Sequence, residues 1–368
     1  MTIEEFSRRT FVAHAMAAAA LPQTMNAASV SGNQDVGGMS PRVAVTSIRR
    51  AFHNGEHNAF TDLCWFQNKI YLTFRSCPDG HMVHPTSCVM ILCSQDKGAT
   101  WKEVHRFSVK HRDTRDPHFL VFKDRLFVYS GTWYSGATTL PRKDYDLNLH
   151  LGYAAWSDDG ETWQGPRVME GTFGHYIWRA ASRGDTAYLC GRRKPQFEVL
   201  ARGEDRNVES LLLESNDGVI WKKCGVFQSS LGDETAFLFE PDGTGLAIAR
   251  DGDGKEAGLL RSQPPYNEWE RISLDRAIGG PLLARWNNRY LVGGRNTINP
   301  SSPRTSLCWL NGSEISEFAE LPSDGDNSYP GFVQLSEMEG LVSWYSSHET
   351  DPTGKTITAI YLANLRLI

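Results

Sequence analysis

The stretch WSDDGETW, residues 156–163, decides the fold of this protein, because its pattern of Ser, Asp, Gly, Thr and Trp recurs along the chain. An earlier copy is SQDKGATW, residues 94–101, and a shortened copy is SNDGVIW, residues 215–221. A fourth stretch, SQPPYNEW at 262–269, keeps only the first serine and the last tryptophan. A motif that recurs in this way indicates a repeat architecture, which has to be recognised before single elements are assigned.

Each copy of the motif lies between two short strand-like runs, so we expect it to form the turn of a β-hairpin. Asp and Gly are residues that tight turns favour. The tryptophan is large enough to pack between neighbouring sheets, once in each repeat. The motif is therefore structural, and we assign it no catalytic role.

The three clearest copies resemble the Asp box, or BNR repeat, of the sialidase (neuraminidase) superfamily. This resemblance implies an all-β fold, a six-bladed β-propeller of four-stranded antiparallel blades. We expect residues 43–368 to form this single domain. About 330 residues shared among six units leave about 55 for each unit, which suits a four-stranded blade.

The first 30 residues are similar to a twin-arginine (Tat) export signal. Arg8 and Arg9 precede an alanine-rich run that ends near Leu21, and small residues follow at Ala27 and Ala28. A short amphipathic helix is the alternative interpretation. The signal predicts export, to the periplasm or out of the cell, with residues 31–42 as a linker. No later apolar run is long enough to span a membrane.

Charge and cysteine content narrow the classes of partner. The chain has 38 basic and 43 acidic residues, a balance that does not indicate nucleic-acid binding. Its seven cysteines are odd in number and lack metal-ligand spacing. Most are expected to be buried, and a disulfide between Cys77 and Cys88 stays an open alternative. We expect a monomer without metal or cofactor that acts on a carbohydrate.

A second repeat runs out of phase with the Asp boxes. In it a polar motif opens a strand, a tight turn follows, and the returning strand ends in a polar residue. The six openings are residues 56–63, 114–122, 175–181, 232–239, 278–285 and 326–333. Because the innermost strands of a propeller all start on one face, these openings should converge there. The strand at 43–50 has no hairpin of its own, so it should pair beside 358–367 and close the ring.

This convergence would gather many polar and aromatic side chains in one place. Each of them alone is better explained as a surface charge or a packed ring. A purely structural ring has no need for so many ionisable groups at one end, which favours a functional site. The candidates are His57, Asn58, Asp62, Arg115, Asp116, Trp178, Arg179, Glu234, Arg250, Arg295, Asp326 and Tyr329.

The order of four of these residues is similar to that in sialidases. By this resemblance Tyr329 is the nucleophile, Glu234 is its base, and Arg250 and Arg295 hold a substrate carboxylate. A neutral phenol suits a sugar with a carboxylate at its anomeric carbon, because that charge would repel an Asp or Glu nucleophile. The phenol has an ordinary pKa of about 10, so it needs a neighbouring base. The arginine fork binds a carboxylate at two points.

The chain departs from the sialidase pattern in its first hairpin. Sialidases carry an arginine in the strand that opens this hairpin, whereas residues 58–62 read NAFTD. Arg75, at the end of the returning strand, is one candidate replacement. Arg49 and Arg50, from the closing strand, are the others. If none of them reaches the site, the substrate differs from an ordinary sialic acid.

The proton donor is a second departure. In the superfamily it is an Asp in the loop after the first returning strand, and that loop here offers Asp79, His81 and His84. Pro78-Asp79-Gly80 reads equally well as a plain turn. Asp62 and Asp116 are rival acids, and His81 is a further donor near neutral pH.

The last hairpin ends in YSSHE, residues 345–349. Tyr345 and His348 are expected to contact substrate. By resemblance Glu349 would orient one of the arginines.

Three functions are consistent with these residues. The first is an exo-acting glycoside hydrolase that releases a terminal acidic sugar, sialic acid or a related one, with retention through a tyrosyl intermediate. The second is a polysaccharide lyase that removes the proton beside a uronic-acid carboxylate, a chemistry that the additional histidines favour. The third is a non-catalytic propeller that binds carbohydrate.

Overall fold

Residues 41–197, 207–297 and 303–368 are described by a computed structural model. Within these ranges the chain is all-β, with 24 strands, three short 3₁₀ helices and no α-helix. No helix among these residues has the length and apolarity needed to cross a membrane. The predicted export signal lies outside the described residues and stays a prediction.

Four of the sheets contain four consecutive antiparallel strands each. The first holds β6 (Arg112–Phe122), β7 (Arg125–Tyr134), β8 (Leu151–Ser157) and β9 (Trp163–Val168). The second holds β10 (Tyr176–Arg183), β11 (Thr186–Arg193), β12 (Glu209–Ser215) and β13 (Lys222–Gln228). The third holds β14 (Gly232–Phe239), β15 (Gly245–Asp251), β16 (Gly258–Ser262) and β17 (Glu270–Ser273). The fourth holds β18 (Ala277–Trp286), β19 (Arg289–Thr297), β20 (Arg304–Asn311) and β21 (Glu314–Leu321).

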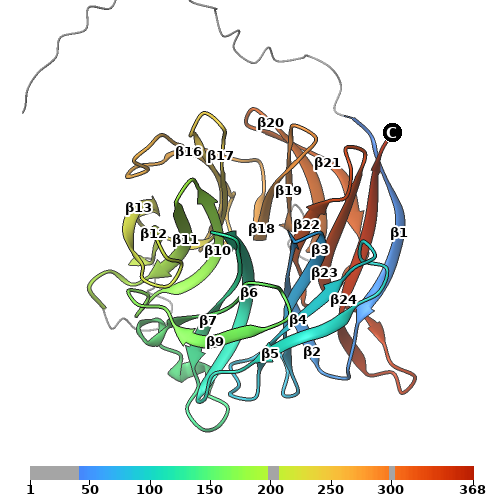
Figure 1. The fold of residues 1–368 in the computed structure, drawn as a ribbon, viewed down its shortest axis with the longest axis horizontal. Coiled ribbons are helices and arrows are strands. Elements are labelled where there is room, and N and C mark those ends of the chain that lie inside the picture. Colours follow the sequence, from blue (N-terminus) through green and yellow to red (C-terminus); the bar gives the residue numbers. More distant parts are fainter. Residues whose placement is uncertain (1–40, 198–206, 298–302) are drawn as a thin grey trace, which may run out of the picture. The chain divides into compact units, whose positions relative to one another are not determined.

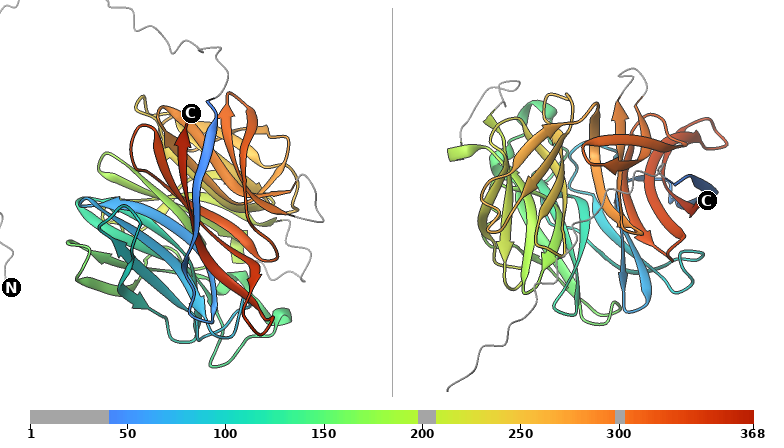
Figure 2. Two further views of the ribbon diagram at one scale, coloured as in Figure 1. Left: turned by 90° about the vertical axis from the view of Figure 1, so that its right-hand side faces the viewer. Right: turned by 90° about the horizontal axis from the view of Figure 1, so that it is seen from above.

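The other eight strands form one sheet of two halves. One half is β2 (His57–Phe66), β3 (Lys69–Cys77), β4 (Cys88–Ser94) and β5 (Lys102–Phe107). The other is β22 (Asn327–Gln334), β23 (Glu339–Thr350), β24 (Thr356–Leu367) and β1 (Val43–Phe52). The halves meet through the parallel pair His57 and Thr358. The antiparallel pairing of β1 with β24 confirms the predicted closing strand (Figure 2).

The first strands of the successive hairpins lie at the centre of the fold. They contact one another in a closed cycle, β2 to β6, β10, β14, β18, β22 and back to β2. The remaining strands of each group lead outward from this cycle, which makes the fold β-propeller-like (Figure 1). All six predicted openings coincide with these strands or their first residues, so the polar motifs begin on one face.

The short helices lie in two loops on that same face. η1 (Arg142–Asp144) and η2 (Leu147–Leu149) belong to the loop after β7, and η3 (Pro195–Phe197) follows β11. The loop after β7 touches the loop after β3, because Tyr145 accepts a hydrogen bond from the backbone of Val83 at 3.1 Å.

The Asp boxes join each sheet to its neighbour. Asp159 Oδ1 accepts the backbone N–H groups of Glu161 and Thr162 at 2.8 and 2.7 Å, which fixes the turn. The turn then approaches the preceding hairpin, where Gln67 donates to the carbonyl of Asp158 at 2.9 Å. Residues 215–221 repeat this arrangement, with Tyr129 donating to the carbonyl of Gly218 at 3.0 Å. The predicted structural role is therefore confirmed.

Apolar side chains fill the space between the sheets. Trp178, Trp286, Trp309 and Trp344 are among the largest fully buried side chains. All seven cysteines are free, so the structure does not contain the Cys77–Cys88 bridge that the sequence left open. The packing is tight where an Asp-box turn meets a neighbouring sheet, since a Cβ added to Gly160 would lie 1.9 Å from the hydroxyl of Tyr71.

Gly160 provides a test of this joint. Its φ of +75° is unfavourable for other residues, and Tyr71 is fully buried and cannot easily move aside. We expect Gly160→Ala to lower the free energy of unfolding by about 2–4 kcal/mol through backbone strain and overpacking. Urea denaturation followed by tryptophan fluorescence measures the change.

Gly354→Ala is the matched control, because Gly354 also has a positive φ, of +83°, but open space around it. This control should lose only about 1 kcal/mol. Equal losses in the two variants would show that the contact between the Asp box and the neighbouring sheet does not constrain the turn.

Candidate active site

A β-bulge occurs in each of the six central strands, close to its start. The pairing with the second strand shifts after Ala59, Arg115, Ile177, Gly232, Gly279 and Ser328. A bulge inserts one extra residue and turns its side chain in a new direction. The first residues of the bulges are Phe60, Asp116, Trp178, Asp233, Gly280 and Tyr329.

Four of these bulge residues have left-handed backbone conformations. The φ angles are 63° at Phe60, 48° at Asp116, 59° at Gly280 and 51° at Tyr329. For a residue with a side chain this conformation costs about 1–3 kcal/mol and is concentrated at functional sites. The repeated strain marks the start of the central strands as the candidate site.

Tyr329 and Glu234 form the centre of this site. The Tyr329 hydroxyl donates a hydrogen bond of 2.6 Å to Glu234 Oε1. Glu234 Oε2 accepts from Arg250 Nη1 at 2.8 Å and from the backbone N–H of Gly280 at 3.0 Å. Both Tyr329 and Glu234 are buried. The phenol therefore has a base in direct contact, which a nucleophilic tyrosine needs.

The neighbouring charges set the protonation of this pair. Burial alone would raise the pKa of Glu234, but the charges of Arg250 and Arg192 and the hydrogen bond from Tyr329 outweigh it and lower the pKa. Burial and the negative charge of Glu234 raise the pKa of Tyr329 well above its ordinary value, with Arg250 opposing them. The resting pair is a neutral phenol beside a carboxylate.

Arg192 is a member of the site that our sequence analysis did not name. Its Nη1 bonds Asp233 Oδ1, and Asp233 Oδ2 lies 3.3 Å from Arg250 Nε. Its position in the repeat could have identified it. Arg192 lies near the end of the third returning strand, as Arg250 and Arg295 lie near the ends of the fourth and fifth. Asp233 pairs with both arginines and holds them side by side.

Arg295 is the least restrained arginine of the site. Its closest carboxylate contact among the described residues is Asp326 Oδ1, 3.9 Å away, and no hydrogen bond of its guanidinium is found among them. The side chain is 24% exposed. Arg295 therefore retains donors for a ligand.

Asp326 is the hub of a second group of polar residues. Its Oδ2 lies 2.9 Å from His57 Nε2 and 2.7 Å from His81 Nδ1, and its Oδ1 accepts from the Tyr345 hydroxyl at 2.9 Å. Burial would raise the pKa of Asp326, but the bonds from His57 and His81 lower it. Asp326 is therefore ionised at neutral pH.

The same three groups could in principle hold a metal ion, since their ligand atoms lie within 4.8 Å of one another. Arg75 Nη1, however, lies 3.5 Å from His57 Nδ1 and can only donate. His57 then carries its proton on Nε2, so the lone pair that a metal needs is absent there. This arrangement favours a hydrogen-bonded cluster over a metal centre.

Asp116 is a buried carboxyl group close to the central pair. Its Oδ1 has no hydrogen-bond partner among the residues that the structure describes. Burial raises the pKa of Asp116 to about 7, with the charge of Arg115 opposing the change and that of Glu234 adding to it. Asp116 is therefore largely protonated below pH 7, as an acid catalyst must be.

Arg75 cannot replace the missing arginine, because its guanidinium is not free to bind a substrate. It is completely buried and forms two hydrogen bonds of 2.9 Å with Asp113. Its other donors go to the carbonyls of Gly80 and Met82. Arg115 shares Asp113 at 3.7 Å and lies over the Phe60 ring. Phe60, in the stretch where the resemblance led us to expect an arginine, therefore packs against the buried cation Arg115.

Arg179, Asp62 and Trp178 form a packed layer under the site. Arg179 donates to Asp62 at 3.2 Å and to the carbonyls of Pro281 and Pro330. Asp62 also accepts from the backbone of Phe119 at 2.9 Å. Trp178 is buried beneath Arg179. These contacts engage the polar atoms of Arg179, expected to contact substrate, and of Asp62, a candidate acid, with other groups of the protein.

The three candidate proton donors in the loop after β3, Asp79, His81 and His84, have different surroundings. Asp79 accepts from Thr86 at 2.6 Å in an exposed turn. His84 is buried and bonded to Thr139 at 2.9 Å. Of the three, His81 alone contacts the cluster around Asp326. Asn58 is buried and bonds Asn54 and the carbonyls of Glu56 and Thr358, so it fixes the start of β2.

The last hairpin contributes Tyr345 but not Glu349. Tyr345 is fully buried beside Tyr329, with ring centroids 5.9 Å apart. Glu349 pairs with exposed Arg50 at 2.9 Å, whereas the sequence analysis expected it to orient one of the site arginines. His348 bonds Ser346, and Arg49 bonds the Asp-box carbonyl of Gly98. Neither Arg49 nor Arg50 replaces the missing arginine, and the third arginine close to Glu234, beside Arg250 and Arg295, is instead Arg192.

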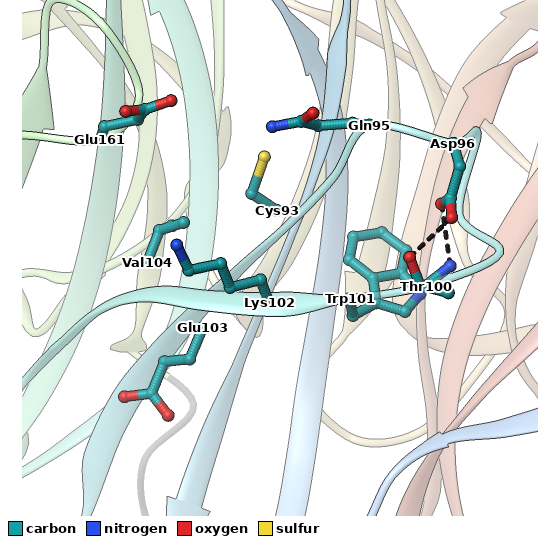
Figure 3. Close-up of a pocket in the computed structure, with 9 residues that line it drawn as sticks. All are labelled: Cys93, Gln95, Asp96, Thr100, Trp101, Lys102, Glu103, Val104 and Glu161. Carbon is teal, nitrogen blue, oxygen red and sulfur yellow. Dashed lines mark hydrogen bonds between the residues drawn. The ribbon is translucent and has the colours of Figure 1, made fainter.

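A hollow of about 550 Å³ lies elsewhere, against the Asp-box turn that connects β4 and β5 (Figure 3). Asp96, Thr100 and Trp101 line it, and none of the residues of the central strands does. Hydrogen bonds from Thr100 lower the pKa of Asp96 to about 2 and hold the turn. The hollow therefore follows from the shape of the Asp box.

Comparison with known proteins identifies the class of fold. No model of a protein family and no curated relative matches the chain. A Dyadobacter fermentans protein of unknown function aligns with a TM-score of 0.71 and 22% identity over 89% of this chain and 100% of its own. Trypanosoma rangeli sialidase bound to the inhibitor DANA aligns with a TM-score of 0.65 and 12% identity, over 84% of this chain and 55% of its own.

A phage phi92 endosialidase is also similar, with a TM-score of 0.65 and 9% identity over 88% of this chain and 69% of its own. At these identities the likeness shows the fold. The protein has a sialidase-like fold, which agrees with the fold expected from the Asp boxes.

The buried acid Asp116 leads to a prediction about stability. Its pKa rises from 3.8 to about 7 on folding, so between these pH values the native state binds more protons than the unfolded state. Stability should then fall as pH rises through this range, by about 4 kcal/mol for a difference of this size. Urea denaturation from pH 5 to 8 measures the slope.

Asp116→Asn cannot titrate, so it should lack the loss of stability that Asp116 causes between pH 5 and pH 8. The free energy of unfolding of the variant, minus that of wild type, should therefore be more positive at pH 8 than at pH 5. The buried histidines titrate in both proteins, so their contribution cancels in the comparison. Parallel stability curves for wild type and Asp116→Asn would contradict a raised pKa at this position.

Proposed function

We propose that this protein is an exo-acting glycoside hydrolase that releases a terminal acidic sugar through a covalent intermediate on Tyr329. The observation that carries the proposal is the 2.6 Å hydrogen bond from Tyr329 to Glu234, flanked by Arg192, Arg250 and Arg295. Sialidase-like neighbours support it, since T. rangeli sialidase is described with bound sialic acid and as a covalent intermediate with 2,3-difluorosialic acid.

The charges of the site favour a substrate with one negative charge. Five arginines, Arg75, Arg115, Arg192, Arg250 and Arg295, lie among four carboxyl groups that pair with them, Asp113, Asp233, Glu234 and Asp326. Asp116 adds no full charge below pH 7. One positive charge remains in excess, and Arg295 has the free donors to direct it at a carboxylate.

The reaction begins with proton transfer from Tyr329 to Glu234. A substrate carboxylate that engages Arg250 and Arg295 takes up part of the positive charge that depresses the pKa of Glu234. Glu234 then becomes a stronger base as the substrate binds. The phenolate attacks the anomeric carbon, and the tyrosyl bond is later broken by water, which retains the configuration.

We also propose that the fold has six blades. The eight-stranded sheet counts as two of them, because the only strand pairing between its halves, among the described residues, is the parallel pair of His57 and Thr358. Six central strands in a closed cycle support this count. Export by the twin-arginine route and a monomeric state remain proposals that rest on the sequence.

A polysaccharide lyase is the second candidate, favoured by the two histidines beside Asp326. Mass spectrometry of the products separates the two reactions. A hydrolase adds the mass of one water, whereas a lyase leaves a new double bond and adds no water.

Tyr329 provides the direct test of the proposed nucleophile. Tyr329→Phe removes the reacting oxygen and keeps the ring, so kcat on a sialic-acid aryl glycoside should fall at least about 10³-fold with little change in affinity. Steady-state kinetics and inhibitor titration measure the two quantities. Glu234→Gln should lower kcat by about 10²–10⁴-fold, as expected for loss of a general base. Full activity of Tyr329→Phe would exclude the mechanism.

Arg295 tests recognition of the carboxylate. Loss of a charged hydrogen bond costs about 1.5–3 kcal/mol, so Arg295→Gln should lower kcat/KM by about 10–100-fold. Arg50→Gln is the control, because Arg50 pairs with Glu349 away from the site and should leave kcat/KM unchanged. Similar values for the two variants would remove Arg295 from substrate binding.

A further inference from the structure

We propose that His81, oriented by Asp326, is the proton donor to the departing group and afterwards the base that activates water. This inference rests on the proposed function, because it supplies the acid that a Tyr329–Glu234 hydrolase still requires. It selects His81 from the candidate acids that the sequence offered, Asp79, His81, Asp62 and Asp116.

The orientation of His81 follows from its hydrogen bond to Asp326. Asp326 Oδ2 lies 2.7 Å from His81 Nδ1, and an ionised carboxylate only accepts, so Nδ1 carries a proton. The other ring nitrogen, Nε2, then holds the proton that can be exchanged. The His81 side chain is 47% exposed, the most open of the ionisable groups in this cluster.

The groups around Asp326 leave His81 as the one histidine able to exchange a proton with a ligand. His57 is half-buried, with 10% of its side chain exposed, and it is held on both sides, with Nδ1 facing Arg75 at 3.5 Å and Nε2 facing Asp326 at 2.9 Å. Burial lowers the pKa of His57, so its ring stays neutral. Tyr345 donates to Asp326 Oδ1 and is fully buried. Each of these contacts fixes Asp326 in place.

His81 also lies at a suitable position relative to the nucleophile. Both residues contact the Phe60 ring, whose centroid lies 5.0 Å from that of Tyr329 and 5.9 Å from that of His81. Arg115 Nη2 donates to the His81 carbonyl at 2.9 Å and holds the loop against β6. The phenol and the imidazole are thus neighbours of the same ring, close enough to act on one bound sugar.

The rival acids are less suited to a departing glycan. The oxygen that leaves remains attached to the rest of the substrate, so its proton donor must lie where solvent and a chain can reach. Asp116 is buried, and Asp62 is engaged by Arg179 and Phe119. Asp79 is exposed, and the hydrogen bond found for its side chain within the described ranges is to Thr86, a residue of its own loop.

The proton balance of both steps is complete. In the first step the C–O bond to the departing group breaks, its electron pair goes to that oxygen, and imidazolium His81 gives it the Nε2 proton while Tyr329 bonds the anomeric carbon. In the second step neutral His81 takes a proton from the attacking water. The tyrosyl C–O bond breaks, and the phenolate recovers its proton from Glu234.

Leaving-group dependence distinguishes this role from a structural one. A methylumbelliferyl sialoside needs little protonation of its leaving group, whereas sialyllactose needs a full proton. We expect His81→Gln to lower kcat/KM on sialyllactose by about 10²–10⁴-fold and on the aryl sialoside by less than about threefold. Asp326→Asn, a change to a positioning residue, should show the same selectivity with a smaller loss.

His84→Gln is the matched control, a histidine of the same loop that bonds Thr139, and it should affect both substrates equally. Equal losses on both substrates in His81→Gln would overturn the proposal, and so would no loss on either. If Asp116→Asn shows the selective loss instead, Asp116 is the acid.

Nitrogen-15 NMR of the histidine rings provides a readout that needs no turnover. We expect neutral His81 to be protonated on Nδ1, and this pattern to be lost in Asp326→Asn. If neutral His81 is protonated on Nε2 instead, the proposed orientation of His81 by Asp326 is wrong. If wild type cleaves neither sialoside while His81 keeps the Nδ1 proton, the proposed function fails on these substrates, but the hydrogen bond between His81 and Asp326 is confirmed.

Discussion

Burial of the Glu234 carboxylate is the constraint on which the rest of the site depends. A buried charge is costly unless opposite charge and hydrogen bonds accompany it. Here Arg250, the Gly280 amide and Tyr329 supply them from three different hairpins. Arg250 in turn requires Asp233, which also holds Arg192. One buried charge therefore organises the arginines that would meet an anionic ligand.

The bulges are the means by which the fold meets this requirement. A regular strand alternates its side chains between the two faces, toward the neighbouring sheets. One extra residue near the start of each central strand turns a side chain toward the axis instead. Tyr329 and Asp116 reach the centre in this way, at the cost of strained φ angles. The strain is tolerated because Asp boxes and tryptophans between the sheets hold the frame.

The two sides of the site have different chemistry. One side is dominated by Arg192, Arg250 and Arg295 and suits recognition of a carboxylate. The other is formed by His81 and His57 around Asp326 and suits proton transfer. Phe60 contacts His81 and Tyr329. With this division the site presents one excess positive charge without an arginine in the first residues of β2.

The sequence by itself determined the β-propeller-like fold, the six hairpins and the closing strand, because turn residues and apolar runs are local signals. It also brought Tyr329, Glu234, Arg250 and Arg295 into one candidate site through their order in the repeat. Only the tertiary structure decided which arginines are free. Arg75, Arg192 and Arg295 look alike at the ends of their strands, yet Arg75 is saturated by Asp113 from another sheet and Arg295 is not. Such pairing depends on residues far apart in the chain, so no local pattern can report it.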